Sequence, residues 1–161
     1  MGYDRAEICL KGHLISASSN YSNHFEFCTA CGSKTINKCP KCNAYILGWP
    51  YDDETELSLR RYGEEFTIPA YCHNCGNPYP WTENNQKRLN ALLLIDTVLT
   101  DEEKSILREH LPDLSVNDAN TLTSAAIIKS ISEKASKTTQ SFIRNLVLSV
   151  AVDSAKKFFG L

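Results

Sequence analysis

The stretch that decides the fold is CTACGSKTINKCPKCN, residues 28–43, in which two Cys-x-x-Cys pairs lie seven residues apart. A third pair closes the cysteine-rich region at Cys72 and Cys75, and a Cys-x-x-x-His pair opens it. Thiolate and imidazole are the ligands that zinc prefers, and a closed structural site takes four of them. The sequence therefore predicts two tetrahedral zinc ions per chain, held by eight ligands with none left over: Cys9, His13, Cys28, Cys31, Cys39, Cys42, Cys72 and Cys75.

Disulfides explain this cysteine pattern less well than metal ligation does. The chain has seven cysteines, an odd number, and the N-terminal MGYDRAEICLKG lacks the apolar core of a secretory signal. A redox Cys-x-x-Cys motif would need only one pair beside a βαβ unit. We therefore expect a reducing, cytoplasmic location, and no membrane-spanning helix because no run of about 18 apolar residues occurs.

The residues that follow the cysteine pairs support metal-binding turns independently. Gly32, Asn43 and Gly76 each come directly after a pair, where such a turn takes a left-handed backbone conformation. Glycine and asparagine tolerate positive φ at low cost. Among the other histidines, His24 is an alternative ligand to His13, and His73 is expected to point outward from its turn.

Two ways of joining the pairs remain open. Sequential pairing places the first four ligands on one ion and the last four on the other. A cross-brace would join the first pair with the third and the second pair with the fourth. We favour sequential pairing, because Phe27-Cys28 and Tyr71-Cys72 give both sites the same order of an excursion, an aromatic residue and a closing Cys-x-x-Cys-Gly.

Composition divides the chain near Trp81 into two predicted domains. Residues 1–81 hold every cysteine and six of the seven glycines, whereas residues 82–161 show helical periodicity. We expect a small, metal-stabilised α+β protein with two consecutive zinc ribbons, at residues 1–37 and 38–81, followed by about four helices in residues 82–161. Short strands are expected at AYILGW (44–49) and EFTIPAY (65–71).

Capping signals place the first two helices. Thr82 is a candidate N-cap for the first. The second begins with a capping box, Thr100-Asp-Glu-Glu103, and stops before Pro112.

The last two helices follow from apolar periodicity. The third is expected to start near Asn117 or Asp118 and to reach Ala135. The fourth is expected from about Thr138 to Phe159. Because it is apolar around most of its circumference, it is either the centre of the bundle or the seam of a homodimer.

No catalytic pattern accompanies the metal ligands, and closed four-ligand sites leave no position for water. We therefore expect a non-enzymatic zinc protein that acts as an adaptor or regulator for an unidentified protein partner. The alternative is a nucleic-acid-binding regulator, in which basic side chains would contact phosphates and an aromatic group would stack on bases. A net charge of −2 weighs against this alternative. The basic residues are Lys34, Lys38, Lys41, Arg60 and Arg61, with Tyr51, Tyr79 and Trp81 as the aromatic group.

Three motifs resemble an uncharacterised bacterial family, a domain of unknown function with zinc-ribbon character. They are Y-D-x-A-x-I-C-x-x-G-H-x-I from Tyr3, F-C-x-x-C-G-x-K-T-I-x-x-C-P-x-C from Phe27, and P-A-Y-C-H-N-C-G-x-P-Y-P-W-T from Pro69. The resemblance is specific over residues 3–83. It implies a bacterial origin and zinc ligation at the eight positions, and it implies no activity.

Overall fold

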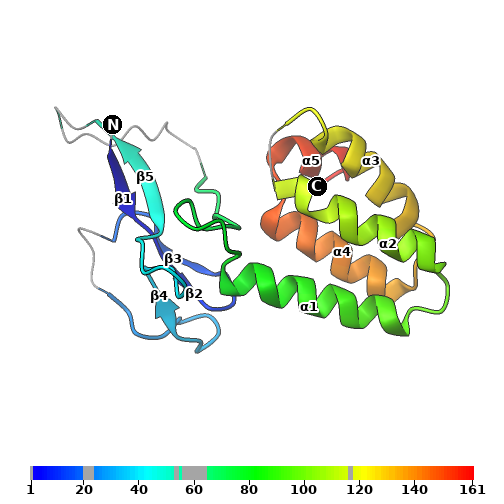
Figure 1. Ribbon diagram of the computed structural model, residues 1–161, viewed down its shortest axis with the longest axis horizontal. Helices are drawn as coiled ribbons and strands as arrows, with labels where there is room; N and C mark the ends of the chain where they lie inside the picture. Colours follow the sequence, from blue (N-terminus) through cyan, green and yellow to red (C-terminus); the bar gives the residue numbers. More distant parts are fainter. Residues whose placement is uncertain (1, 20–23, 53–54, 56–64, 116–117) are drawn as a thin grey trace. The chain divides into compact units, whose positions relative to one another are not determined.

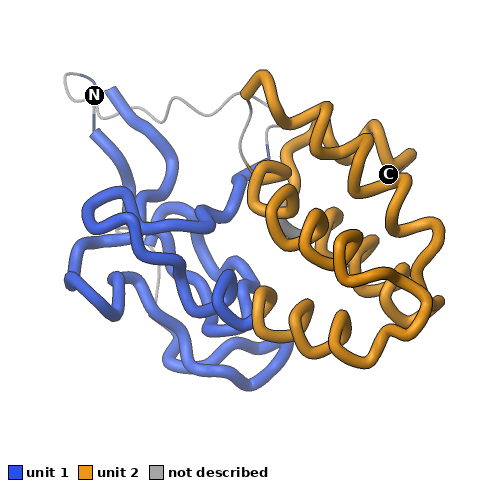
Figure 2. The backbone as a smooth tube through the Cα atoms, turned by 45° about the vertical axis from the view of Figure 1, so that its right-hand side comes forward, with its two compact units in different colours: residues 1–84 blue, residues 85–161 orange. Residues whose placement is uncertain are grey.

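The computed structural model describes residues 2–19, 24–52, 55, 65–115 and 118–161. The chain forms two compact units, residues 1–84 and 85–161, shown in separate colours in Figure 2. Arg60, Arg61 and Asn117, singled out above, lie outside the described residues.

Short strands organise the first unit (Figure 1). They are β1 (Gly2–Arg5), β2 (Glu7–Cys9), β3 (Leu14–Ser16), β4 (Thr35–Ile36) and β5 (Leu47–Tyr51). Antiparallel β2 lies between β3 and β4 in a three-stranded sheet, and β1 pairs with β5 in a separate two-stranded sheet. The β1–β5 pair joins the two halves of the unit, because it ties residues 2–5 to residues 47–51.

Gly48 permits this joining. A Cβ atom at Gly48 would lie 2.0 Å from the carbonyl oxygen of Ala17, a distance that no side chain tolerates. The next residue, Trp49, donates its backbone N–H to that same oxygen at 3.0 Å. A glycine is therefore required where β5 crosses the segment that follows β3.

The core of the first unit includes cysteines from the second metal-ligand set. Its buried members are Ala6, Ile8, Cys39, Ile46, Cys72, Tyr79 and Trp81. The rings of Tyr79 and Trp81 stack 4.7 Å apart, and Trp81 Nε1 donates to the Pro69 carbonyl at 2.9 Å. Both rings are buried, so the structure uses them for packing and they cannot offer a stacking platform to a ligand.

One of the two expected strands is wrong. AYILGW overlaps β5, but residues 65–71 contain no strand, and only Tyr71 makes an isolated bridge, to Pro78. The alternating apolar residues of EFTIPAY pack against the core without forming a strand, with Phe66 and Ile68 half-buried there.

The helical region holds five α-helices and one 3₁₀ helix within the described residues (Figure 1), where about four helices were expected. They are α1 (Pro80–Ile95), α2 (Asp101–His110), the 3₁₀ helix η1 (Leu111–Ser115), α3 (Thr121–Ser132), α4 (Lys137–Val150) and α5 (Asp153–Phe158). None of the described helices combines the length and the apolar character needed to cross a bilayer.

The capping predictions have mixed outcomes. The capping box is confirmed: Glu103 N–H donates to Thr100 Oγ1 at 3.2 Å, and Thr100 N–H donates to the Glu103 carboxylate at 3.0 Å. Thr82 as an N-cap is wrong. α1 begins two residues earlier at Pro80, a residue suited to the first helical position, and the Thr82 hydroxyl donates to the Ala70 carbonyl at 2.8 Å.

The last two helices also differ from expectation. α3 begins at Thr121, because Asp118 accepts the backbone N–H groups of Asn120 and Thr121 in a turn before the helix. The single helix expected from Thr138 to Phe159 is interrupted, because Ala151 takes an extended conformation and Val152 N–H donates to the Leu114 carbonyl at 2.9 Å.

A buried carboxylate links the end of α1 to the start of α4 in the second unit. Asp96, just after α1, is 3% exposed. Its Oδ2 accepts the Thr139 hydroxyl at 2.6 Å and the Ser136 N–H at 3.0 Å, both at the start of α4. Its Oδ1 accepts the Val98 and Leu99 N–H groups at 2.9 and 3.1 Å. Burial opposes ionisation, but these donors hold the pKa of Asp96 well below its usual range.

Candidate metal centres

The first group of metal-ligating side chains combines the end of a strand with two turns. Cys9 ends β2, His13 lies just before β3, and Cys28 and Cys31 come from the turn before β4. The four donor atoms lie within 4.8 Å of one another. Cys9 Sγ is 3.8 Å from Cys31 Sγ, and Cys28 Sγ is 3.6 Å from His13 Nδ1.

The second group consists of four cysteines from two turns that are 30 residues apart in sequence. Cys42 Sγ is 3.6 Å from Cys72 Sγ, and Cys39 Sγ is 3.8 Å from Cys75 Sγ. All four sulfurs lie within 4.8 Å of one another. The first cysteine of each pair is buried, and the second is half-buried.

These separations suit a shared metal ion and not a disulfide. A disulfide brings two sulfurs to about 2.05 Å. Two thiolates that each bind one tetrahedral ion at about 2.3 Å lie about 3.8 Å apart. The sulfur–sulfur distances of 3.6–3.8 Å match the second arrangement. Each group could therefore hold one metal ion, and all four donors of each come from the protein.

The grouping is sequential. Cys9, His13, Cys28 and Cys31 form one group, and Cys39, Cys42, Cys72 and Cys75 form the other. A cross-brace would instead have placed Cys28 beside Cys75. His24 is not part of either group: its Nδ1 lies 3.0 Å from the carboxylate of buried Glu7. His73 is exposed on its turn and is likewise in neither group.

The three Cys-x-x-Cys turns share one backbone geometry. In each, the residue after the second cysteine donates its N–H to the carbonyl of the first cysteine at 2.8–2.9 Å. These residues are Gly32, Asn43 and Gly76, with φ of 66°, 62° and 67°, so the predicted left-handed conformations are confirmed. A backbone bridge then closes each turn, between the residue before the first cysteine and the third residue after the second: Phe27–Lys34, Lys38–Tyr45 and Tyr71–Pro78.

The Cys9–His13 turn is one residue longer and reaches a similar result. Cys9 N–H donates to the His13 carbonyl at 3.0 Å, and His13 N–H donates to Cys9 Sγ at 3.2 Å. Gly12 has φ of 89° and approaches Trp81 closely, since a Cβ atom there would lie 3.1 Å from the Trp81 Cβ. The positive φ favours glycine here, and the close approach to Trp81 leaves little room for a side chain.

Backbone amides surround the sulfurs and favour their thiolate forms. Burial opposes this effect at Cys72, but the N–H groups of Asn74 and Cys75 lower the pKa of the Cys72 thiol to about 6. The hydroxyl and N–H of Ser33 lower the pKa of Cys31 to about 6 as well. Since the thiolate is the metal-binding form, these amides prepare the sulfurs for ligation.

Burial has the opposite effect at two cysteines, since it raises the pKa of Cys9 as well as that of Cys39. It raises the pKa of Cys39 to about 11, even though the N–H groups of Lys41 and Cys42 face its sulfur. A buried thiolate needs a compensating positive charge. A cation bound by the second group would supply that charge, which is a further reason to expect one there.

Sequence reasoning missed three residues that contact the sulfurs. Asn77 Nδ2 donates to Cys75 Sγ at 3.4 Å, and Ser33 occupies the same offset after its own pair. Tyr79, buried beside the second group, hydrogen-bonds to Cys72, and burial together with the cysteine charges raises the pKa of its phenol. A polar residue two positions after a Cys-x-x-Cys pair was the available signal for Ser33 and Asn77.

A family model matches this arrangement over nearly the whole chain, at residues 2–159. Its description is an uncharacterized protein conserved in bacteria, DUF2321. The chain belongs to the DUF2321 family. The resemblance to an uncharacterised bacterial family is thereby confirmed. Comparison of this DUF2321 protein with curated proteins and with solved structures found no match.

Proposed function

We propose that this DUF2321 protein is a non-enzymatic zinc protein of the cytoplasm, in which two closed zinc sites stabilise a ribbon-type module. The observation that carries the proposal is the closure of both groups, since each offers four protein donors at separations suited to one tetrahedral ion. Thiolate-rich tetrahedral sites suit zinc or iron, and we propose zinc, which structural sites of the Cys₄ and Cys₃His types bind.

One described cluster in the second unit has the composition of a catalytic triad but not its geometry. Ser124, His110 and Asp113 lie together, but the Ser124 hydroxyl donates to Asp113 Oδ2 at 2.6 Å, while His110 Nδ1 lies 3.0 Å from the Ser124 hydroxyl oxygen. A catalytic triad needs the imidazole to take the serine proton. Here the Ser124 hydroxyl donates to the Asp113 carboxylate and not to the imidazole, and Ser124 is buried. The cluster therefore links α2, η1 and α3 structurally.

The zinc-stabilised module would serve to bind a protein partner. Each Cys-x-x-Cys turn presents an exposed aromatic ring on its closing bridge: Phe27 is 56% exposed, Tyr45 37% and Tyr71 39%. Rigid aromatic side chains are enriched at protein interfaces, because they contribute large contact areas at small entropic cost. Rings held in place by metal-bound turns meet that requirement.

A second candidate, single-stranded nucleic acid binding, is favoured by the surroundings of one ring. The Arg5 guanidinium lies 3.9 Å from the centre of the Tyr45 ring, and Lys38 Nζ lies 4.6 Å from it. Aromatic rings interleaved with cations are typical of sequence-tolerant single-strand binding. The chain's net charge of −2 limits how many phosphates it can neutralise, so we rank this function second.

One pair of measurements separates the two functions. Zinc-loaded chain is used as bait for nuclease-treated bacterial extract, and its affinity for labelled single-stranded DNA is measured in parallel. The variant Phe27→Ser/Tyr71→Ser removes two exposed rings without touching a ligand. Leu122→Ser, at an exposed apolar position in α3, is the matched control.

The proposal predicts a nuclease-resistant partner that binds wild type and the Leu122 control but not the double variant. Tight, salt-sensitive DNA binding by the wild type would replace it with the second candidate. Retention of the same partner by all three proteins would show that the rings are not the binding surface.

A further inference from the structure

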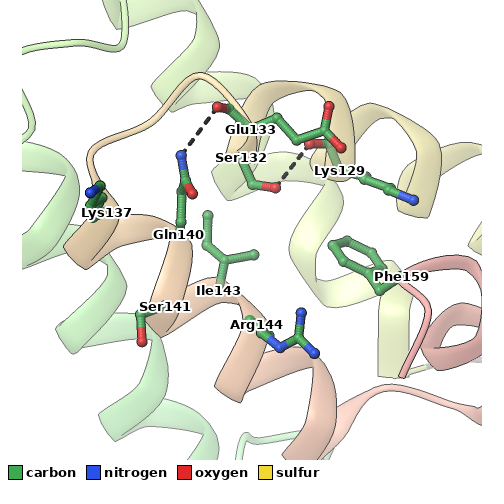
Figure 3. Close-up of a pocket in the computed structure, with 9 residues that line it drawn as sticks. All are labelled: Lys129, Ser132, Glu133, Lys137, Gln140, Ser141, Ile143, Arg144 and Phe159. Atoms are coloured by element: carbon green, nitrogen blue, oxygen red, sulfur yellow. Dashed lines mark hydrogen bonds between the residues drawn. The ribbon is translucent and has the colours of Figure 1, made fainter.

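A hollow of about 390 Å³ lies within the second unit, between the end of α3, the first half of α4 and the residue after α5 (Figure 3). Its volume falls within the range of small-molecule sites. Lys137, Gln140, Ser141 and Arg144 all line it, and their spacing places them on one face of α4. The hollow belongs to the helical unit and shares no residue with the metal-ligating groups.

The walls of the hollow carry an excess of positive charge. Lys129, Lys137 and Arg144 line it, against a single carboxylate from Glu133, which leaves a net charge of +2. Lys129 is held at the edge, where it donates to the Phe158 carbonyl at 3.2 Å. Within the described part of the chain, Lys137 and Arg144 form no ion pair, whereas Lys134 and Lys156 do. Two cations are therefore available to an anion.

The floor of the hollow is apolar and ends at an aromatic ring. Ile143 is fully buried beneath it, and half-buried Phe159 closes one end. Figure 3 shows Arg144 extending toward the Phe159 side of the hollow. A ligand that filled this space would place a flat or apolar part on the exposed side of Phe159 and its charge near Arg144.

Gln140 adds a directed acceptor. Its Nε2 donates to the Glu133 carbonyl at 3.1 Å (Figure 3) and to the Ala135 carbonyl at 2.8 Å, so the amide is fixed in one orientation. This orientation leaves Oε1 to accept a hydrogen bond from a ligand N–H. An amide held by two backbone groups can select for an amino group at little entropic cost.

We propose that this pocket binds a nucleoside monophosphate. A phosphate monoester carries a charge of about −1.5 to −2 at pH 7, which matches the surplus of +2 in the walls. Arginine recognises phosphate through paired N–H donors, and lysine adds a point charge. The base supplies the flat ring for Phe159, and an amino-bearing base supplies the donor for Gln140 Oε1.

The test is an NMR titration of the zinc-loaded, full-length, ¹⁵N-labelled chain with AMP, with adenosine and inorganic phosphate in parallel. AMP is expected to cause saturable shifts at the end of α3, the start of α4 and Phe159. Arg144→Gln removes charge-assisted hydrogen bonds and should weaken binding about tenfold or more. Lys87→Gln, an exposed charge on α1 outside the pocket, should change it by less than about twofold.

Several results would overturn the proposal. These are the absence of saturable shifts, shifts centred outside the pocket, or adenosine or phosphate binding as tightly as AMP. Lys137→Gln is a second variant at an exposed position, so a folding defect in Arg144→Gln would not leave the question open. Equal AMP affinity in wild type and in Lys137→Gln/Phe159→Leu would also refute it.

Discussion

Replacement of Asp96 by asparagine tests the physical account of the helical unit. The side chain keeps its size but loses its charge, and one of its two oxygens becomes an NH₂ group. In the wild type, Oδ1 and Oδ2 each accept two hydrogen bonds. An amide can satisfy only one of these pairs, so its NH₂ group must face either Ser136 N–H or the Val98 and Leu99 N–H groups.

The expected cost follows from those contacts. A hydrogen bond to a charged acceptor contributes about 1.5–3 kcal/mol, and a buried donor left unpaired costs about 1–3 kcal/mol. Since the bonds share one carboxylate and are not additive, we expect Asp96→Asn to lower the free energy of unfolding by about 2–4 kcal/mol. For a unit of this size the melting temperature should fall by roughly 10–30 °C.

Far-UV circular dichroism is the suitable assay, because four of the five α-helices lie wholly in the second unit. Asp153→Asn removes the same charge from an exposed position in α5 and is the matched control, with an expected change of about 0.5 kcal/mol or less. A melt of Asp96→Asn that coincides with the control would refute the reasoning.

The stability difference between wild type and Asp96→Asn should also change with pH in a defined direction. The pKa of Asp96 is depressed in the folded state, so its ionised form stabilises the fold above the unfolded pKa of about 3.9. This stabilisation is lost as the pH falls toward the folded-state pKa. The stability gap between wild type and Asp96→Asn should therefore be constant near neutral pH and shrink below about pH 4. A gap that widens on acidification would contradict this.

Three further predictions concern other parts of the chain. Gly48→Ala should destabilise the first unit by about 3 kcal/mol, because the added Cβ would collide with the Ala17 carbonyl oxygen. Both tryptophans lie in that unit, so their fluorescence reports its unfolding. An unchanged melting curve would show that the strands cross differently. Thr100→Ala should cost about 1 kcal/mol in helical melts, since it removes half of the capping box with Glu103, and no loss would show that the cap is dispensable. Removal of the metal with a chelator should change the tryptophan fluorescence and leave most of the helical circular dichroism signal intact, because both metal-ligating groups lie in the first unit. Parallel loss of both signals would show that the units unfold together.

Local chemistry made the metal-binding turns predictable from the sequence. The positive φ at Gly32, Asn43 and Gly76 follows from which residues tolerate a left-handed backbone. The capping box at Thr100 depends only on residues within one helical turn. Such features need no knowledge of distant parts of the chain.

The features that the sequence did not predict depend on distant contacts. The pairing of β1 with β5 depends on the close approach of Gly48 to the Ala17 carbonyl, which no local sequence pattern predicts. The break between α4 and α5 contains neither glycine nor proline, and it is stabilised by the bond from Val152 N–H to the Leu114 carbonyl. The homodimer through the C-terminal helices stays a prediction, which sedimentation at high concentration would test.

Native mass spectrometry of the chain and of Cys75→Ser tests the central claim most directly. The wild type should carry two zinc ions. The variant should keep one, because Cys75 belongs only to the group with Cys39, Cys42 and Cys72. A thiol probe should then label Cys39 and Cys42 while Cys28 and Cys31 stay protected. Iron in place of zinc, fewer than two ions in the wild type, or labelling of Cys28 and Cys31 in the variant would contradict two closed, sequential zinc sites.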